Sequence, residues 1–475
     1  MTTFPLLNPG RQAPVGDGVE EISGPELALR VAQVKDRLAA RGLTGRRICL
    51  AMDAGLGAIA VLIAALETGT RAALIPRPAR TETPDWPAFC DAVAIPPEPG
   101  QPIGDLTLLA QEAGPDPAPG DRGRIWLRSS GTTGTPKWVL HDTPRLYANA
   151  AAAGARLGLT GQDRVLIPVP VNHMFGFGAA FLPALQAGAA IRLAARGNPL
   201  VIFQAQRSFQ PTAMFLVPSQ CRSIMALGRK AGRARLIVVA GDRLAAAEAA
   251  AFEADHGRLV NLYGSTEMGA ISAGHPDGPA ALRHLTAGPP VANVRLAIDP
   301  PTDPDPAAEG ALPMRMVHGA GFLGYCDPAT GALTAPAPDL WPTGDLVRLH
   351  PAPDGGDAPW IEVMGRADHA VNRDGLLVHL GQIEGVLARA PGVALSAVVA
   401  AGQSRRGMGL AAFVTLTRAQ ATTPDDLLAA CRAELPARAV PDVLHVLAEM
   451  PMLASGKVDR RRLAALAAEK AAAQG

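Results

Sequence analysis

Nine consecutive residues combine hydroxyl groups, glycines and one lysine: Ser129-Ser130-Gly131-Thr132-Thr133-Gly134-Thr135-Pro136-Lys137. Glycines let a backbone approach an anion closely, N–H and hydroxyl groups donate hydrogen bonds, and an ammonium adds a point charge. The segment therefore predicts a phosphate-holding loop. It is not a Walker A loop, because Trp138 follows the lysine where that motif has Ser or Thr. A flexible linker is the alternative, although linkers rarely lie between two apolar segments.

A second segment, Asn261-Leu262-Tyr263-Gly264-Ser265-Thr266-Glu267, follows an apolar run. The ring of Tyr263 can stack on an adenine, and the hydroxyl of Thr266 can bind a phosphate. Glu267 offers the hard oxygen ligand that magnesium prefers. The segment predicts binding of a nucleotide with Mg²⁺, and the alternative is a turn that ends in a capping acid.

Two further residues stand in short loop-forming motifs. Asp345 ends Pro342-Thr343-Gly344-Asp345, and its carboxylate can accept hydrogen bonds from both ribose hydroxyls, although such turns are common in structural roles. Lys457 lies in Ser455-Gly456-Lys457 and is one of only five lysines among 44 basic residues. Because lysine and arginine are not interchangeable, this placement predicts a functional ammonium rather than a surface lysine.

In this order, the motifs resemble those of the adenylate-forming superfamily, which includes acyl-CoA and aryl-CoA synthetases, peptide-synthetase adenylation domains and luciferases. The resemblance covers residues 125–463, and Gly365-Arg366-Ala367-Asp368 is similar to the hinge of that family. It implies an α/β fold, with a large domain of helix-covered β-sheets and a smaller, mobile α+β domain at the C-terminus.

The resemblance also implies a role for individual residues. Lys457, with His173, Thr266 and Glu267, is implied to be catalytic, and Glu267 would bind Mg²⁺. Asp368 would be the pivot of the small domain, and Gly375 would line the tunnel for the thiol. The implied ATP- and AMP-binding residues are Ser129, Ser130, Gly131, Thr132, Thr133, Gly134, Lys137, Asn261, Tyr263, Gly264, Ser265, Thr266, Asp345 and Arg366.

Asn172-His173-Met174-Phe175-Gly176 resembles the family segment beside the acyl pocket, which would place His173 near the reacting carboxylate. A buried structural histidine is the alternative. Amino-acid-activating relatives have an aspartate in this region, so its absence favours an acid without an α-amine. An apolar pocket for an aryl or medium acyl group is expected, with the candidates His173, Phe175, Phe177, Leu216, Ala240 and Leu262.

The chain departs from the family pattern at several positions. Trp138 replaces a glycine, Asn372 stands where a lysine is common, and Gln382 stands where a glutamate is usual. Gly241-Asp242-Arg243 differs from the small, glycine-rich segment that usually flanks the adenine. The first three changes remove no group that the expected chemistry requires.

The elements that must position these residues follow from the apolar pattern. Short runs such as RICLAM, RVLIPVP, AMFLVP and RLIVVAG alternate with Ala-rich helical segments, which predicts parallel sheets covered by helices. A polar stretch near Gly365 predicts a boundary between a domain of residues 1–365 and one of residues 366–475. The apolar segment 54–66 is too short to span a bilayer and is expected to be a buried helix.

The composition favours small-molecule chemistry. The formal net charge is +1 over 475 residues, so binding to nucleic acid or acidic lipid is not expected. Five scattered cysteines and the absence of a secretory signal at the N-terminus favour a reducing cytoplasm. We expect no membrane span, and either a monomer or a homodimer.

These observations predict an acid–thiol ligase that uses ATP and Mg²⁺ to form an acyl-adenylate and then transfers the acyl group to coenzyme A. The acceptor could instead be the phosphopantetheine thiol of an acyl carrier protein. A luciferase-like oxygenase shares the adenylation motifs, and emission of light with oxygen would distinguish it. A non-enzymatic nucleotide-binding regulator is the remaining alternative, which the presence of Glu267 and Lys457 disfavours.

Overall fold

The computed structural model describes residues 12–79, 85–112, 123–129, 137–194, 197–230, 232–298, 312–317, 321–353, 355–356, 358–366, 370–373, 376–405, 407–417, 422–453 and 457–472. The chain divides into two compact units. The first contains Met1–Leu296, Met316–Trp341 and His350–Ile361, and the second contains Ala297–Arg315, Pro342–Leu349 and Glu362–Gly475. The expected domains 1–365 and 366–475 stay a prediction.

The first unit contains an eight-stranded sheet in the order β14-β13-β12-β11-β9-β10-β1-β2. Its strands from β13 to β1 are parallel, and antiparallel strands form both edges, so the expected parallel sheet is confirmed. The strands, in sheet order, are Gly269–Ala273, Gly257–Ser265, Ala234–Val239, Ala213–Leu216, Arg164–Ile167, Ala190–Leu193, Val15–Gly16 and Glu21–Ile22.

A second eight-stranded sheet has the order β18-β17-β8-β7-β4-β3-β5-β6. It is parallel through β7, β4, β3 and β5 and antiparallel elsewhere. Its strands, in sheet order, are Leu333–Pro336, Gly324–Cys326, Trp138–Asp142, Arg124–Arg128, Arg71–Pro76, Arg47–Met52, Ala92–Ile95 and Thr107–Ala110.

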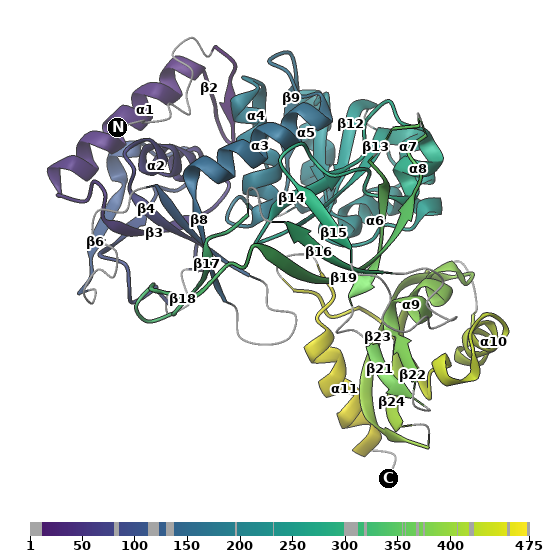
Figure 1. Ribbon diagram of the computed structural model, residues 1–475. Coiled ribbons are helices and arrows are strands. Elements are labelled where there is room, and N and C mark those ends of the chain that lie inside the picture. The colour runs from purple at the N-terminus through teal and green to yellow at the C-terminus, as the bar shows by residue number, and fades with distance from the viewer. Residues whose placement is uncertain are drawn as a thin grey trace. The chain divides into compact units, whose positions relative to one another are not determined.

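Helices cover these sheets (Figure 1). Helix α2, Leu56–Glu67, is apolar on nearly all sides and almost entirely buried, which confirms the expected core helix. Helix α3 begins where the Asp142 carboxylate caps the amide of Arg145 at 2.8 Å and ends at the left-handed Gly158. The other helices of this unit are α1 Gly24–Ala40, η1 Ile103–Asp105, η2 Phe175–Phe181, α4 Leu182–Gln186, α5 Pro199–Phe209, α6 Pro218–Ala226, α7 Ala246–His256 and α8 Ala280–Leu285.

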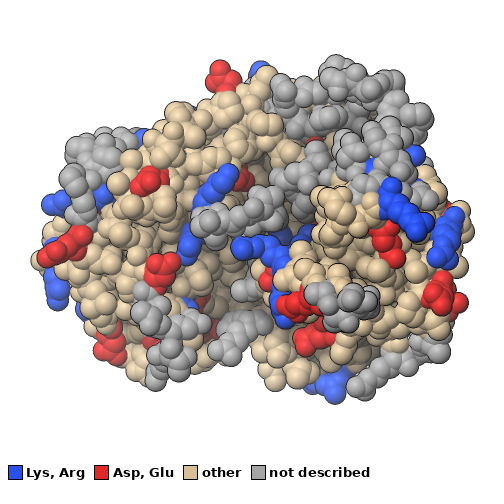
Figure 2. Space-filling model, turned by 90° about the horizontal axis from the view of Figure 1, so that it is seen from below, with Lys and Arg blue, Asp and Glu red and all other residues tan. Residues whose placement is uncertain are grey.

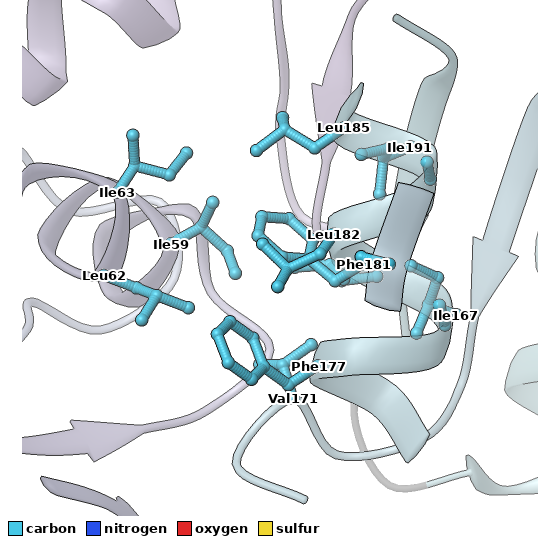
Figure 3. Close-up of a cluster of buried hydrophobic side chains, with 14 of the residues drawn as sticks. Ile59, Leu62, Ile63, Ile167, Val171, Phe177, Phe181, Leu182, Leu185 and Ile191 are labelled. Carbon is cyan, nitrogen blue, oxygen red and sulfur yellow. The ribbon is translucent and has the colours of Figure 1, made fainter. Parts of the chain in front are cut away.

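The main core lies between the two sheets. Side chains of α2 meet those of η2 and α4 there, as Figure 3 shows for Ile59, Leu62, Phe177 and Leu182. Alternate residues of the first sheet face opposite sides, because side chains alternate along a strand. In β11, Phe215 belongs to this main core, while Leu216 belongs to a second core beneath α5, α6 and α7.

A four-stranded sheet has the order β15-β16-β19-β20, with the bounds Arg295–Ile298, Leu312–Val317, Leu340–His350 and Trp360–Arg366. The second unit has a further sheet in which β22, β21, β24 and β23 are adjacent in that order and β25 pairs with β24. Its strands and helices are β21 Ala370–Arg373, β22 Leu376–His379, α9 Leu380–Arg389, β23 Val393–Ser404, β24 Gly407–Leu416, α10 Pro424–Glu434, η6 Ala437–Ala439, β25 Val443–Leu447 and α11 Arg460–Ala472.

Strand β24 shows how this sheet is sandwiched. Leu410 and Ala412 face a core shared with α9 and α10, whereas Ala411 and Phe413 face a core shared with Leu463 of α11. The predicted α/β class, with sheets covered by helices and a smaller α+β part at the C-terminus, is thus confirmed. Over the described part of the chain, no helix has the length and apolar character that a bilayer crossing requires.

Candidate active site

The predicted phosphate loop connects two strands of a hairpin. Strand β7 ends at Arg128, which pairs with Trp138 at the start of β8. The Ser129 amide donates to the Lys137 carbonyl at 2.9 Å, and the Lys137 amide donates to Ser129 Oγ at 3.2 Å. Residues 130–136, which include the predicted ligands Ser130, Gly131, Thr132, Thr133 and Gly134, lie outside the described residues. The pairing of β7 with β8 and the two hydrogen bonds between Ser129 and Lys137 therefore hold the described ends of the loop together.

Trp138, the first residue of β8, is buried. Its ring lies edge-on to Phe89 with centroids 5.4 Å apart, and the Arg128 guanidinium lies 5.5 Å from its centre. The indole therefore fills a core position and anchors the strand that begins directly after Lys137.

The second predicted motif spans the end of β13 and the turn into β14. Gly264 must be a glycine, because a Cβ there would lie 2.3 Å from the Gly269 carbonyl oxygen on the neighbouring strand. The Ser265 hydroxyl accepts a hydrogen bond from the Met268 amide at 3.1 Å. This tight turn presents Thr266 and Glu267, both half-buried, at its tip.

Tyr325 brings the two motifs together. Its hydroxyl donates to Glu267 Oε1 at 3.0 Å, and the ammonium of Lys137 lies 4.9 Å from the centre of its ring. Strand β17 carries Tyr325 and pairs with β8, so that Tyr325 lies opposite Val139. The Phe322 amide also donates to the Glu267 carbonyl at 2.7 Å. A cation and a carboxylate from segments about 130 residues apart thus meet at one aromatic residue.

Two buried polar residues on the segment after the loop support the Thr266–Glu267 turn. His141 Nε2 lies 2.8 Å from the Thr266 carbonyl oxygen, so that nitrogen carries the proton. Asn149 of α3 makes a reciprocal pair with Ala270, donating to its carbonyl and accepting from its amide, both at 2.8 Å. Strand β8 and helix α3 are therefore each bonded to the segment that carries Glu267, on either side of that residue.

Asn261, a predicted nucleotide ligand, has its side chain directed to the backbone. Its amide nitrogen donates to the carbonyls of Arg283 at 2.9 Å and His284 at 3.2 Å. Both residues also bind the carboxylate of Glu253. Burial works to raise the pKa of Glu253, but hydrogen bonds from Arg283, the Leu259 amide and His284 outweigh it and hold that pKa at about 2. The Asn261 side chain thus ties β13 to α8.

The predicted acyl-pocket residues follow the carboxyl ends of adjacent parallel strands. His173 follows β9, Leu216 ends β11, Ala240 follows β12 and Leu262 lies near the end of β13. Ligands bind at this edge of open parallel sheets, so these candidates stand at the edge where such folds bind ligands. The acyl pocket itself stays a prediction. His173 is half-buried, its amide donates to the Pro170 carbonyl at 3.3 Å, and its own carbonyl accepts from Phe177.

The structure does not bring all six candidates to one face. Ala240 and Leu262 belong to the main core, and Phe175 packs against its margin. Leu216 points to the opposite side of the sheet, and its neighbour Phe215 lies on the side of Ala240 and Leu262. Phe177 is fully buried and faces Ile59 and Leu62 of α2 (Figure 3). The alternation of β11 and the π-helical turn of η2 account for these directions.

The remaining predicted residues belong to the second unit. Thr343 Oγ1 accepts a hydrogen bond from the Asp345 amide at 3.1 Å, on either side of the left-handed Gly344 in β19. Lys457 lies in a hairpin where its carbonyl accepts from the Leu453 amide at 2.7 Å and Met452 bridges Val458. Arg366 ends β20, its side chain lies outside the described part of the chain, and so do Asp368 and Gly375.

Arg460 anchors the hairpin that carries Lys457. Its guanidinium donates to both carboxylate oxygens of Glu384 on α9, the longer contact being 3.0 Å, and to the Val398 carbonyl at 3.1 Å. Glu384 in turn accepts from the Val398 amide at 2.7 Å. The first residue of α11 is therefore fastened to the sheet, three residues after Lys457.

Residues 91–321 match the AMP-binding enzyme family, and residues 382–457 match the AMP-binding enzyme C-terminal domain. Together the two matches span well over half of the chain. The chain belongs to the AMP-binding enzyme family. The predicted resemblance to adenylate-forming enzymes is thereby confirmed.

Named relatives of this AMP-binding enzyme include a synthase and a ligase. The salicylyl-CoA synthase / salicylate adenylyltransferase of a Streptomyces species is 30% identical over 71% of this chain and 62% of that protein. The 4-hydroxybenzoate-CoA/benzoate-CoA ligase of Rhodopseudomonas palustris is 28% identical over 78% of this chain and 69% of that protein. The chain thus aligns with slightly under two thirds of the first relative and slightly over two thirds of the second.

A solved structure supports the fold. ATP-bound MatB from Rhodopseudomonas palustris superposes with a TM-score of 0.79 at 19% identity, over 98% of this chain and 99% of that one. On the face that Figure 2 shows, basic and acidic side chains of the AMP-binding enzyme are interspersed among uncharged residues.

Sequence reasoning missed Tyr325, His141 and Asn149. Tyr325 is one of only three tyrosines in the sequence, which was the available signal. The contacts of the other two residues join segments about 120 residues apart, and such pairings are visible only in the folded chain.

Proposed function

We propose that the protein is an AMP-forming carboxylic acid–thiol ligase. In the first half-reaction a carboxylate oxygen attacks the α-phosphorus of ATP, the bond to the β-phosphate breaks, and acyl-adenylate and pyrophosphate form. In the second, a thiolate attacks the acyl carbon, a thioester forms and AMP leaves. One observation carries the proposal: the loop cation Lys137 and the carboxylate of Glu267 meet at Tyr325.

Attack on a phosphorus needs in-line placement and neutralised charge more than covalent help. The loop ended by Ser129 and Lys137 would hold phosphate oxygens, with Ser130, Gly131, Thr132, Thr133 and Gly134 supplying further donors. Tyr263 would stack on the adenine, and Thr266 would donate to a phosphate. Asp345 and Arg366 would hold the ribose, and His173 would lie beside the substrate carboxylate.

The residues present fit Mg²⁺. Glu267 offers a half-buried carboxylate, of which one oxygen accepts a single hydrogen bond from Tyr325. A carboxylate has about four acceptor positions, and Mg²⁺ is commonly held by one or two carboxylates together with substrate phosphates. When bound, Mg²⁺ would neutralise charge on the phosphate groups.

We infer that the two domains, residues 1–365 and 366–475, divide the work. Lys457 in the small domain would stabilise charge developing at the α-phosphate. The contacts of Arg460 anchor the hairpin that carries Lys457, which supports a fixed position for its ammonium. Asp368 would be the hinge between the half-reactions, and Gly375 would line the thiol tunnel.

Aromatic carboxylates are the first substrates to test. Two relatives are named for salicylate, benzoate and 4-hydroxybenzoate, and the strand edge beside His173 carries Phe175, Phe215, Ala240 and Leu262 on its pocket side. Coenzyme A is the proposed acceptor, with the pantetheine thiol of a carrier protein as the alternative. The proposed setting is the cytoplasm, and the five cysteines are all buried and unpaired.

ATP–pyrophosphate exchange over a panel of carboxylic acids, without any thiol, tests the proposal. We expect exchange with a subset of aromatic acids and, on addition of coenzyme A, the matching thioester with AMP. Transfer only to a carrier protein would select the alternative acceptor. Formation of ADP, or no exchange with any acid, would contradict the proposed function.

A further inference from the structure

The two opposite charges of the candidate site meet on Tyr325 rather than on each other. The Lys137 ammonium lies 4.9 Å from the ring centre, and the hydroxyl bonds one Glu267 oxygen at 3.0 Å. A cation is attracted to the face of an aromatic ring, whereas a phenolic hydroxyl donates to a carboxylate from the ring edge. One side chain therefore serves both charges through different parts of its structure.

The ring of Tyr325 is held in an aromatic cluster. Phe322 and Trp341 lie edge-on to it, with centroids 5.2 Å and 5.7 Å away, and they lie 4.8 Å from each other. Phe322 is fully buried and its amide is bonded to the Glu267 carbonyl at 2.7 Å. The ring and hydroxyl thus have a fixed position relative to the Glu267 backbone.

A purely structural aromatic residue would not need the hydroxyl, because ring packing alone would fill this cluster. A residue that holds only the glutamate would not need to face the loop lysine. Without the ring, the Lys137 ammonium could pair directly with the Glu267 carboxylate, and a pair of this kind must separate before both groups can meet a nucleotide and its cation.

We propose that Tyr325 is a positioning residue for capture of ATP with its divalent cation. Its ring keeps the Lys137 ammonium available for phosphate, and its hydroxyl orients the Glu267 carboxylate toward the metal. This inference rests on the proposed function of the same site. It assigns Tyr325 no contact with the reacting atoms.

Two substitutions separate the two parts of this role. Tyr325→Phe removes the hydroxyl and keeps the ring, whereas Tyr325→Leu removes both. Tyr147→Phe is the matched control, because it makes the same chemical change in a buried tyrosine of α3 outside the site. Calorimetric titration with ATP, in Mg²⁺ and in EDTA, measures binding without requiring turnover.

For Tyr325→Phe we expect ATP affinity in EDTA to be unchanged and the half-saturating Mg²⁺ concentration to rise roughly 5- to 10-fold, since a hydrogen bond to a charged group is lost. For Tyr325→Leu we expect an additional loss of ATP affinity in EDTA, because Glu267 then captures Lys137. Adding Glu267→Gln to Tyr325→Leu should restore the affinity in EDTA. Tyr147→Phe should behave as the unmodified protein.

An unchanged Mg²⁺ requirement in folded Tyr325→Phe would overturn the proposal, as would equal losses in Mg²⁺ and EDTA. If Tyr325→Leu fails to fold, the Mg²⁺ response of Tyr325→Phe decides alone. If ATP binds but no acid supports pyrophosphate exchange, the proposed function is contradicted. The binding results then still decide whether Tyr325 is a positioning residue. Absence of ATP binding by the unmodified protein would contradict both.

Discussion

At the scale of single residues, Glu267 is the most informative position, because charge can be removed there with almost no change in volume. Glu267→Gln keeps an oxygen that can accept from the Tyr325 hydroxyl, so the turn should remain folded. The variant loses the anionic ligand that Mg²⁺ prefers. We expect adenylation to fall on the order of 100-fold or more, comparable to loss of one preorganised charge-stabilising group, with an unchanged melting temperature.

Thermal unfolding and pyrophosphate exchange, measured on the same preparation of Glu267→Gln, distinguish a loss of stability from a loss of adenylation. A sharp drop in melting temperature with normal activity of the remaining folded protein would make Glu267 a structural acid. His173 is half-buried. The same pair of measurements distinguishes a catalytic from a structural role for this residue.

At the scale of elements, the predicted runs RICLAM, RVLIPVP, AMFLVP and RLIVVAG became β3, β9, β11 and β12, because each is a short apolar segment between turn residues. Local pattern was sufficient for these strands and for the buried helix α2. It was not sufficient for β17, whose three residues have little pattern of their own and pair with β8 from far along the chain. Tyr325 was missed for the same reason.

The face of each strand was the other feature that local pattern did not determine. Strand β11 is buried on both sides, so its sequence is apolar throughout and does not reveal which residue faces the pocket. Leu216 ends this strand, yet Phe215 lies on the side of Ala240 and Leu262.

The link between α7, β13 and α8 makes a prediction about pH. The pKa of Glu253 is lowered to about 2 in the folded protein, from a model-compound value of 4.5. Its contribution to stability is therefore fully present above about pH 4.5 and is lost as the pH falls toward 2. Glu253→Gln should lower the free energy of unfolding at pH 7 by about 1–3 kcal/mol, because charged hydrogen bonds are lost.

Urea unfolding at several pH values between 3 and 7 checks this expectation. The difference in stability between the unmodified protein and Glu253→Gln should stay constant from pH 7 to about pH 4.5 and shrink as the pH falls further toward 3. A difference that is constant with pH would show that Glu253 is not the titrating group, even if the variant is less stable.

At the scale of the whole molecule, the proposed division of labour makes Lys457 necessary for one half-reaction. Lys457→Ala should slow adenylation on the order of 100- to 1000-fold, since one preorganised charge is lost. Thioester formation from a supplied acyl-adenylate should continue. Lys470→Ala, the same change on α11, is the matched control and should leave both half-reactions intact.

Both half-reactions should be measured separately on these two variants. Normal pyrophosphate exchange by Lys457→Ala would remove this lysine from the first half-reaction. Failure of the folded variant to use supplied acyl-adenylate would contradict a division of labour between the domains.

Transfer of labelled oxygen tests the central claim, formation of an acyl-adenylate, most directly. The acid that supports exchange is supplied with ¹⁸O in its carboxylate, together with ATP, Mg²⁺ and coenzyme A, and the products are analysed by mass spectrometry. Because a carboxylate oxygen becomes the bridge to the α-phosphorus and leaves with it, each turnover should place one ¹⁸O in AMP and none in pyrophosphate. Label in inorganic phosphate, or unlabelled AMP beside a labelled thioester, would contradict the account.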